Sequence, residues 1–341
     1  MNILVTGGSG FIGSNLVRYL IENTNNNILN VDKLTYAANN SFSKKILDNK
    51  RYSFSKTDIC SDKIFELLIK FSPDIVINMA AESHVDNSIN APYNFIRTNI
   101  VGTYNLLNNC LKYFKENSRL NISNFKFIHI STDEVYGDLK DQTSIAFREN
   151  TAYNPSSPYS ASKASADHLV KAWYRTYQLP CIIINSANNY GPFQNKEKLI
   201  PLSIINAIQG KDLPIYGNGK QIRDWLYVED HVKAINKVIN IGKIGEKYNI
   251  GARNSIENII LVKNICSILD IIYPPINNPK VKDSYDSYSK LIKYVADRPG
   301  HDVHYAIDPS KIEKELGWQP EESFENGLRK TINWYIKENK N

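Results

Sequence analysis

The sequence predicts an α/β protein with a doubly wound parallel sheet, followed by a smaller α/β C-terminal part. Three observations predict this fold class. Short β-branched runs alternate with amphipathic stretches through the first half, a glycine-rich turn follows the first run, and Gly and Pro become frequent after about residue 187. Alternating strands and helices are typical of parallel strands joined by right-handed crossovers.

The expected elements follow from the spacing of apolar residues. Compact apolar runs predict strands at 3–6, 28–32, 52–56, 74–79, 125–131 and 181–185. Apolar residues at helical spacing predict helices at 11–22, 62–71, 94–115 and 159–177. Later in the chain we expect a helix at 229–241, a strand at 247–250, and closing helices at 310–316 and 323–337.

The shift in character near residue 187 predicts two domains. We expect a ligand-binding domain over 1–187 and a second domain over 188–341, with part of 225–255 crossing back to the first. The 341 residues suffice for a core without disulfides. The four cysteines are scattered with no metal-like pairing, so we expect reduced thiols and no metal site.

Composition and charge exclude several classes of protein. With 42% hydrophobic and 22% charged residues, the chain is neither a disordered chain, a collagen nor a coiled coil. A net charge of +6 suits a small anionic ligand and falls short of a nucleic-acid binder. The sequence contains no apolar run of about 18 residues and no secretory signal. We therefore expect a cytoplasmic protein that binds neither nucleic acid nor membrane.

The glycine-rich turn predicts a dinucleotide site. Gly7, Gly10 and Gly13 follow the first strand and open the first helix, with the spacing G-x-x-G-x-x-G. Such glycines permit a tight turn, close approach of the backbone to a pyrophosphate, and packing of the helix on the sheet. The N–H groups at the helix start then bind the phosphates. The pattern indicates a Rossmann-type fold.

Asp32 predicts which dinucleotide binds. It ends the second strand, 19 residues after Gly13, where a carboxylate hydrogen-bonds the adenosine ribose. A carboxylate repels a 2′-phosphate, so NAD is favoured over NADP. Lys33 follows directly and weakens that discrimination.

Tyr159 and Lys163 are candidates for redox chemistry. At a spacing of four residues they share one face of the expected helix. An ammonium near a phenol stabilises the phenolate and lowers the phenol's pKa. The pair is therefore suited to take a proton from an alcohol that is being oxidised.

Thr132, Asp133 and Glu134 follow the strand expected at 125–131. The carboxyl ends of strands face the ligand crevice of an open α/β sheet. Two adjacent carboxylates there can divide the roles of acid and base if their environments separate their pKa values.

Together these motifs resemble the extended short-chain dehydrogenase/reductase family of nucleotide-sugar epimerases and dehydratases. The resemblance covers nearly the whole chain. The shared segments include 6–13, 31–37, 80–86, 131–137, 188–192, 198–201, 223–227 and 297–302. Thr-Asp-Glu at 132–134 and Arg-Pro-Gly-His-Asp at 298–302 resemble the 4,6-dehydratases in particular.

The resemblance implies dehydration of dTDP-glucose to its 4-keto-6-deoxy sugar, with tightly bound NAD that is regenerated in each turnover. Tyr159 would deprotonate the C4 hydroxyl, which Thr132 would hydrogen-bond. Lys163 would lower the Tyr159 pKa and hold the nicotinamide ribose. Glu134 would take the C5 proton, and Asp133 would protonate the departing C6 hydroxyl.

The resemblance also implies binding residues. Cofactor contacts would come from Gly7, Gly10, Phe11, Ile12, Gly13, Asp32, Lys33, Leu34, Thr35, Asp58, Ile59, Ala80, Ala81, Thr98, Tyr159, Lys163 and Asn189. The nucleotide-sugar would contact Ser83, Thr132, Asn188, Lys198, Leu199, Pro214, Tyr216, Arg223, Asn258, Arg298 and His301.

Three positions depart from the family's pattern. Ala38 stands where glycine is usual, residues 185–187 replace a common Cys-Ser, and Val303 and His304 replace paired arginines. The last change removes positive charge near the nucleotide, so the base, thymine or uracil, stays open.

Three other interpretations also stay open: a UDP-glucose 4,6-dehydratase, a nucleotide-sugar 4-epimerase, and a non-catalytic NAD-binding sensor. An epimerase has no use for an acid–base pair, and a sensor would not keep the Tyr–Lys pair. Helices 94–115 and 159–177 carry apolar residues on more than one face, which together with the resemblance predicts a homodimer through a four-helix interface.

Overall fold

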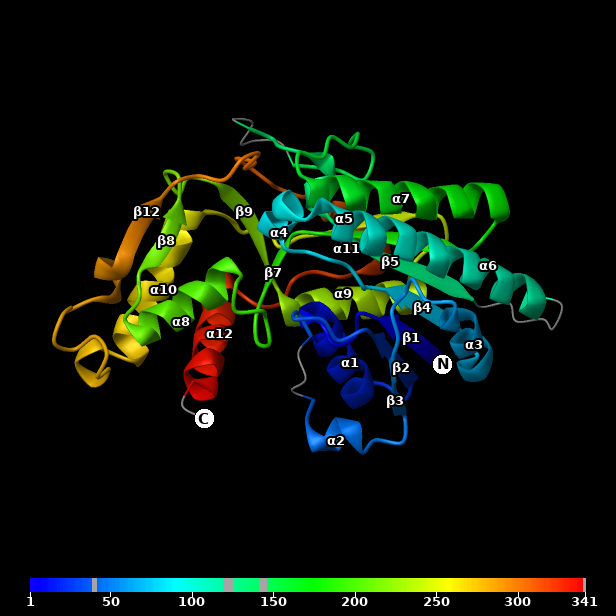
Figure 1. The fold of residues 1–341 in the computed structure, drawn as a ribbon, viewed down its shortest axis with the longest axis horizontal. Coiled ribbons are helices and arrows are strands. Elements are labelled where there is room, and N and C mark those ends of the chain that lie inside the picture. The colour runs from blue at the N-terminus through cyan, green and yellow to red at the C-terminus, as the bar shows by residue number, and fades with distance from the viewer. Residues whose placement is uncertain (39–41, 119–124, 141–145, 340–341) are drawn as a thin grey trace.

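The computed structural model describes residues 1–38, 42–118, 125–140 and 146–339. A seven-stranded sheet forms its centre (Figure 1). The strand order is β10-β6-β5-β4-β1-β2-β3, and every pair is parallel. The strands are β1 (Asn2–Thr6), β2 (Asn27–Asp32), β3 (Tyr52–Lys56), β4 (Ile75–Asn78), β5 (Lys126–Thr132), β6 (Cys181–Ser186) and β10 (Lys247–Ile250). The order reverses beside β1, as in a doubly wound sheet, which confirms the expected fold class.

Helices cover both faces of this sheet. One apolar core joins it to α1 (Phe11–Asn23), α9 (Val228–Ile241) and α11 (Ser310–Leu316). A second core joins the opposite face to α3 (Lys63–Phe71), α6 (Thr103–Ser118) and α7 (Pro158–Tyr177). Side chains that alternate along each buried strand therefore reach two different cores, which explains the nearly continuous apolar runs in the sequence.

The helix expected at 94–115 is not a single α-helix. The chain forms α4 (Val85–Asn90), α5 (Pro92–Phe95), a π-helical segment at Ile96–Gly102, and then α6. Gly102 ends the π-helical segment against Ile59, where an added Cβ would lie 2.6 Å from the Ile59 side chain. The apolar spacing predicted a helix here but not its π-helical segment, which lies beside the close contact between Gly102 and Ile59.

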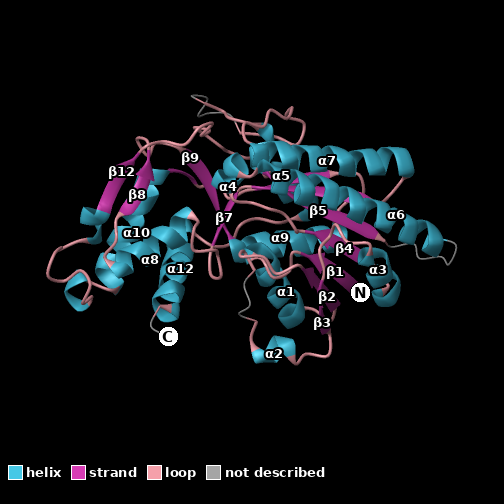
Figure 2. Ribbon diagram, viewed as in Figure 1, coloured by secondary structure: helices cyan, strands magenta, loops and turns pink. Residues whose placement is uncertain are grey.

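The C-terminal part contains two small sheets (Figure 2). One has the order β11-β9-β7, with β7 (Asn188–Tyr190), β9 (Ile222–Tyr227) and β11 (Ser255–Glu257); the other pairs β8 (Leu213–Tyr216) with β12 (Ile292–Val295). Helices α8 (Leu199–Gln209), α10 (Asn258–Ile272) and α12 (Phe324–Glu338) pack around a third core. Sequence patterns missed α8 and α10 because both are rich in isoleucine, which by itself favours strands.

The remaining elements are short. They are α2 (Lys44–Leu47) and 3₁₀ turns at Asp133–Tyr136, Pro275–Asn277 and Tyr288–Leu291. Residues 247–250 lie within the large sheet although they follow the C-terminal part's first strands in sequence. Among the described residues, no helix combines the length and apolar character needed to cross a membrane.

Candidate functional site

The turn between β1 and α1 is built from backbone. Gly7 has a φ of +68°, and a Cβ there would lie 2.6 Å from the backbone nitrogen of Ala80. A Cβ at Gly13 would lie 2.2 Å from the carbonyl oxygen of Gly7. Both positions therefore require glycine, one for conformation and both for space. The result is a bare backbone surface at the start of α1, the feature that a pyrophosphate needs.

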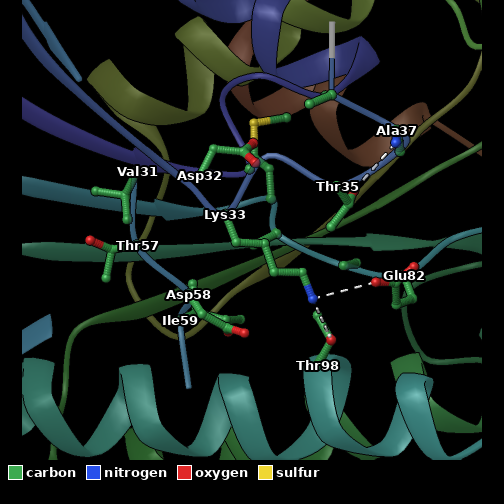
Figure 3. A pocket seen from close by; sticks show the side chains of 16 residues that line it. Val31, Asp32, Lys33, Thr35, Ala37, Thr57, Asp58, Ile59, Glu82 and Thr98 are labelled. Carbon is green, nitrogen blue, oxygen red and sulfur yellow. Dashed lines mark hydrogen bonds and ion pairs between the residues drawn. The ribbon is translucent and has the colours of Figure 1, made fainter. Parts of the chain in front are cut away.

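A first pocket lies at the carboxyl ends of β1, β2 and β4 (Figure 3). Ten of the residues expected to bind cofactor line it: Gly7, Gly10, Asp32, Lys33, Thr35, Asp58, Ile59, Ala80, Ala81 and Thr98. These strand ends therefore bring most of the residues expected to bind the cofactor to one concave surface.

The Asp32 carboxylate is fixed by backbone donors. Its two oxygens accept hydrogen bonds from the backbone N–H groups of Ser9, at 3.0 Å, and Leu34, at 2.8 Å. Leu34 adopts a φ of +58° and itself lines neither this pocket nor the adjoining one. Its expected role is thus limited to the backbone that orients Asp32.

Lys33 is engaged by an acidic partner. Its Nζ lies 3.4 Å from Oε1 of Glu82 and donates to the Thr98 hydroxyl at 3.2 Å (Figure 3). The sequence suggested that this cation would weaken discrimination against NADP. Glu82 offsets the lysine's charge, so Asp32 remains the dominant charge at the ribose end.

A second pocket adjoins the first and shares Gly7, Gly10, Ala37, Met79 and Ala81 with it. Six further expected cofactor residues line this pocket: Phe11, Ile12, Gly13, Tyr159, Lys163 and Asn189. The expected sugar contacts Ser83, Thr132, Asn188 and Lys198 line it as well, together with Glu134. The fold therefore places the cofactor and catalytic residues along one continuous cleft.

The redox candidates project from α7 toward the end of β5. Helix α7 starts at a capping box between Ser157 and Ser160, which fixes Tyr159 in its first turn. The Thr132 hydroxyl lies close enough to the Tyr159 phenol to favour its ionised form, and both side chains line the second pocket. Lys163 lies one turn later and donates to the carbonyl oxygen of Ile130 at 2.7 Å. Strand end and helix start thus hold the three groups together.

Burial dominates the titration of Tyr159 and Lys163. It raises the pKa of Tyr159 well above its usual value of 10.0, and the nearby Glu134 adds to this rise. Burial also lowers the pKa of Lys163 to about 8, against which Asp167 acts. The pKa of Tyr159 is therefore raised in this structure. Its expected lowering by Lys163 stays a prediction for the enzyme with NAD bound.

The adjacent carboxyl groups occupy different environments. Asp133 is 1% exposed and does not line the cleft, and one of its oxygens, Oδ2, lacks a hydrogen-bond partner among the described residues. Its other oxygen accepts from Thr132 at 3.2 Å. Burial, with repulsion from Glu134, raises the pKa of Asp133 well above its usual value. This carboxyl group is therefore set up to hold a proton.

Glu134 faces the cleft and is opposed by cations. Burial raises its pKa, but Arg223, Arg298 and Lys198 counteract that rise. The two neighbouring carboxyl groups are thus separated by their surroundings, which favours an acid at Asp133 and a base at Glu134.

The other expected nucleotide contacts, here called the C-terminal cluster, all come from the C-terminal part of the chain. Leu199, Pro214, Tyr216, Arg223, Asn258, Arg298 and His301 line neither of the two pockets. His301 lies edge-on to Tyr216, with ring centroids 6.3 Å apart, and its Nδ1 is 2.7 Å from Oδ1 of Asp297. Arg298 pairs with Asp86 at 3.2 Å. Two members of the cluster, Arg298 and Arg223, nevertheless act on the cleft, because their positive charges favour the ionised form of Glu134.

The Arg223 side chain binds a neighbouring segment of backbone, a role that the sequence did not predict. Its guanidinium donates to backbone carbonyls of Ile222, Asp302 and Val303 and lies 4.3 Å from the centre of the Tyr305 ring. The atypical Val303 donates its backbone N–H to Asp138. Arg223 thus fastens the 302–305 segment to β9.

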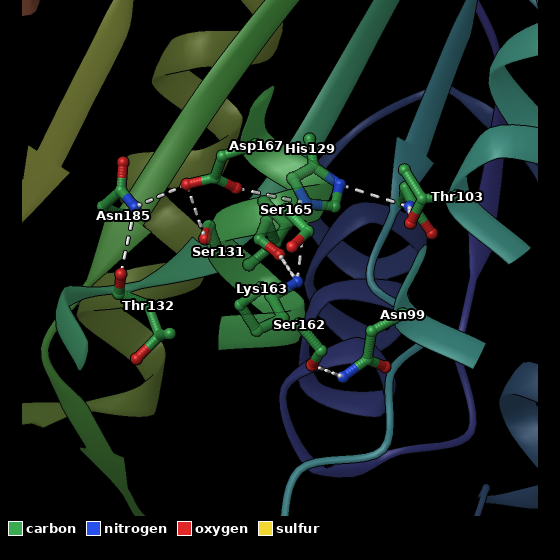
Figure 4. A network of polar contacts seen from close by, with 12 residues as sticks. Asn99, Thr103, His129, Ser131, Thr132, Ser162, Lys163, Ser165, Asp167 and Asn185 are labelled. Atoms are coloured by element: carbon green, nitrogen blue, oxygen red, sulfur yellow. Dashed lines mark hydrogen bonds and ion pairs between the residues drawn. The ribbon is translucent and has the colours of Figure 1, made fainter. Parts of the chain in front are cut away.

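Sequence reasoning missed a buried polar network beneath Lys163 (Figure 4). It contains His129 from β5, Asp167 from α7 and Asn185 from β6, all 2% exposed or less. Asp167 follows Lys163 by four residues, as Lys163 follows Tyr159. That repeated spacing on one helix face was the available signal.

The sheet topology, the glycine turn with Asp32, and the Tyr159–Lys163 pair at the same edge define an extended short-chain dehydrogenase/reductase. The family model described as GDP-mannose 4,6 dehydratase matches residues 4–331, so the chain belongs to that family.

Relatives agree with this assignment over nearly the full chain. The dTDP-glucose 4,6-dehydratase of Escherichia coli is 55% identical, covering 98% of this chain and 94% of that protein. The dTDP-glucose 4,6-dehydratase of Bacillus anthracis, solved in complex with NAD, is 42% identical, with a TM-score of 0.84 and coverage of 100% and 98%. DesIV, a dTDP-glucose 4,6-dehydratase of Streptomyces venezuelae solved with NAD and TYD bound, is 36% identical, with a TM-score of 0.87 and coverage of 99% and 97%.

Proposed function

We propose that this protein is an NAD-dependent lyase that dehydrates dTDP-glucose to dTDP-4-keto-6-deoxy-glucose. The observation that carries the proposal is the pair Asp133 and Glu134 beside Tyr159, with one carboxyl group buried among acidic neighbours and the other facing three cations. A 4-epimerase would not need that pair, and a non-catalytic sensor would not need Tyr159 and Lys163. The similarity to three dTDP-glucose 4,6-dehydratases supports the same substrate.

The first pocket and the glycine turn hold NAD. Asp32 binds the adenosine ribose, the backbone at residues 10–13 binds the pyrophosphate, and Lys163 reaches the nicotinamide ribose. When bound, NAD would supply the acceptor for the hydride that leaves C4 of the sugar and the donor for the hydride that C6 receives in the same turnover. The chain's own residues therefore move only protons.

Tyr159 removes the proton of the C4 hydroxyl, and Thr132, which contacts Tyr159, hydrogen-bonds the same oxygen. A phenol with a raised pKa stays protonated at neutral pH and cannot accept a proton, so the site must bring positive charge close to it to favour the phenolate. Lys163, whose ammonium lies in the same pocket, supplies that charge.

Glu134 and Asp133 carry out the elimination. The new C4 ketone acidifies the C5–H bond, and Glu134 takes that proton and gives it back to C5 when C6 accepts the hydride. Asp133 lies directly behind the cleft, between Thr132 and Glu134, which both line it, and it supplies the proton with which the C6 hydroxyl leaves as water. The cations around Glu134 keep it ionised for this step, and the burial of Asp133 keeps it protonated.

The C-terminal cluster binds the nucleotide diphosphate. Arg223 and Arg298 suit the phosphates because a guanidinium binds phosphate oxygens in pairs. Tyr216, His301, Asn258, Pro214 and Leu199 surround the nucleoside. Asn188, whose buried Oδ1 lacks a partner among the described residues and which lines the cleft, is placed for the sugar or diphosphate.

The experiment that tests the function compares dTDP-glucose and UDP-glucose as substrates of the purified protein. The 4-keto product absorbs strongly in alkali, and we expect it chiefly from dTDP-glucose. Faster turnover of UDP-glucose, or a C4 epimer as product, contradicts the proposal. Denaturing the protein as purified should release NAD; release of NADP contradicts the assignment of Asp32.

The assembly extends the same proposal. Helices α6 and α7 bury Leu106, Leu107 and Val170 against their own sheet. Tyr104 remains 47% exposed beside the Trp173 ring, 5.8 Å away, which leaves an apolar face for a partner copy. We infer a cytoplasmic homodimer through this helix pair, with an NAD-binding domain over 1–187 and a nucleotide-sugar domain over 188–341, of which part of 225–255 crosses back to the first domain. A monomeric mass in light scattering at micromolar concentration contradicts it.

A further inference from the structure

The network beneath Lys163 is fixed by an ordered set of hydrogen bonds (Figure 4). The Thr6 hydroxyl donates to Oδ1 of Asn78 at 2.8 Å, which sets the orientation of that amide. The amide nitrogen of Asn78 therefore faces Nδ1 of His129, 3.2 Å away. Because an amide nitrogen only donates, His129 Nδ1 must accept, and the ring's proton resides on Nε2.

The Nε2 atom of His129 lies beside Asp167, whose Oδ1 has no hydrogen-bond partner among the described residues. Nε2 lies 3.4 Å from Oδ1 of Asp167. Burial and the charge of Lys163 lower the pKa of His129 well below its usual value, so the ring is neutral. His129 is 1% exposed and Asp167 is 2% exposed. A neutral imidazole thus stands against a buried carboxyl group.

The second oxygen of Asp167 accepts from three side chains. The donors to Oδ2 are the hydroxyl of Ser131 at 2.9 Å, the phenol of Tyr153 at 2.7 Å and the amide of Asn185 at 3.2 Å. Burial raises the pKa of Asp167, and Lys163 with these three donors acts against that rise. Hydrogen bonds to a carboxylate favour its charged form. The site is therefore arranged around an ionised Asp167.

The Asp167 carboxylate acts on the ammonium group of Lys163. Its Nζ lies 3.5 Å from His129 Nε2, so His129 stands in contact with both charged groups. Three titratable groups lie around Lys163: Tyr159 and Asp167 on its own helix, and His129 on β5. Two more, Tyr153 and Lys247, lie on the far side of Asp167. There the Lys247 ammonium donates to the Tyr153 phenol at 3.2 Å. Asp167 is the acidic group that supports the charged form of Lys163.

We propose that Asp167 is a positioning residue of the reaction: its charge, acting across the neutral His129 ring, keeps the buried Lys163 protonated and in place for Tyr159 and the cofactor. It acts on the strand end as well, because Ser131 donates to Asp167 while Asn185 also donates to the carbonyl oxygen of Thr132 at 3.0 Å. The inference rests on the proposed reaction, in which Lys163 works as a cation.

The kinetic test is the pH profile of Asp167→Asn. An ammonium without its counter-ion loses its proton at lower pH, and an opposite charge nearby shifts a pKa by about 1–3 units. We expect the alkaline limb of the kcat profile to move to lower pH by about one unit. A purely structural role lowers kcat equally at all pH values and leaves the limb in place, which overturns the proposal.

The second test measures unfolding and needs no substrate. Breaking a buried charge pair is costly, whereas removing both charges is tolerated far better. Asp167→Asn should therefore lower the thermal midpoint more in the wild type than in Lys163→Met. If Asp167→Asn alone does not fold, the double variant should regain folding. Equal effects in both backgrounds, or no rescue, overturn the proposal.

Asp224→Asn is the matched control for the unfolding cycle. Asp224 is also 1% exposed, but its carboxylate accepts from the backbone N–H groups of Ala252, Arg253 and Asn254. Its effect should be the same with and without Lys163→Met. Since this cycle is independent of turnover, a wrong substrate assignment and a wrong role for Asp167 give different results.

Discussion

The cofactor half and the nucleotide half of the site are built in different ways. At the cofactor half, backbone makes the binding surface: Gly7 and Gly13 allow close approach, and the N–H groups of Ser9 and Leu34 fix Asp32. At the nucleotide half, Arg298 and His301 are side chains held by Asp86 and Asp297. The first half is thus set by the fold, whereas the second depends on contacts between side chains that a diphosphate would compete for.

This difference predicts separable defects. Changes at the cofactor half should affect folding and NAD together. Changes at the nucleotide half should affect substrate binding while the protein keeps its NAD. The two carboxyl groups, Asp133 and Glu134, belong to neither half, and changes there should affect neither NAD nor substrate binding.

The largest expected effect is that of Tyr159→Phe. Loss of a general base typically costs about 10²–10⁴-fold in rate. We expect kcat to fall on that scale with NAD content unchanged. No NADH absorbance should appear when substrate is mixed with the variant, because the first proton is never removed. Normal NADH formation contradicts the role of Tyr159.

Gly7→Ala should break the cofactor half. Its positive φ costs an L-residue roughly 1–2 kcal/mol, and overlap with the Ala80 backbone adds roughly 1–3 kcal/mol more. Gly317→Ala is the matched control, since its φ is +62° but a Cβ there meets nothing within 4 Å. Chemical denaturation should show the larger loss for Gly7→Ala, together with loss of NAD. Equal losses of stability in the two variants would contradict the close approach of Gly7 to the Ala80 backbone.

Arg298→Ala should break the nucleotide half and leave the cofactor half intact. A charged hydrogen bond contributes about 1.5–3 kcal/mol, so KM should rise roughly 10- to 100-fold. Bound NAD, measured after denaturation, should not change. Arg329→Ala is the control, because its ion pair with Glu325 lies on the exposed side of α12. A fall in NAD content in Arg298→Ala would mean that the two halves are not separable.

The smallest effect concerns pH. Glu134 works as a base only when ionised, so turnover falls as the pH drops through its pKa. Burial raises that pKa above its usual 4.5, so the acidic limb should lie above that value. Lys198→Met removes one of the opposing cations and should move the limb to still higher pH. An unchanged or lower limb contradicts the assigned surroundings of Glu134.

The same comparison explains what the sequence could predict. The cofactor half was predictable because each of its requirements, a positive φ at Gly7 or a carboxylate at the end of β2, is local in the chain. The position of Asp133 was not, because its burial depends on strands and loops far apart in sequence. Likewise Lys33 gave no sign of its partner Glu82, which lies 49 residues later.

The C-terminal elements show a further limit. Helices α8 and α10 were missed because isoleucine-rich segments such as Ile204–Ile205 have no clear period when both sides of a helix are covered. The Asp167 network was missed for a related reason. His129 and Asn185 lie inside apolar strand segments, where a polar side chain gives no sign of its partner.

The central claim is that Asp133 and Glu134 act after Tyr159 has begun the oxidation. Glu134→Gln mixed rapidly with dTDP-glucose, and followed by the near-ultraviolet absorbance of bound NADH, tests it most directly. We predict that NADH accumulates, that the C5 hydrogen does not exchange with solvent deuterium, and that turnover falls by about 10²–10⁴-fold. Normal turnover, or no NADH at all, would contradict the division of roles between the redox pair and the two carboxyl groups.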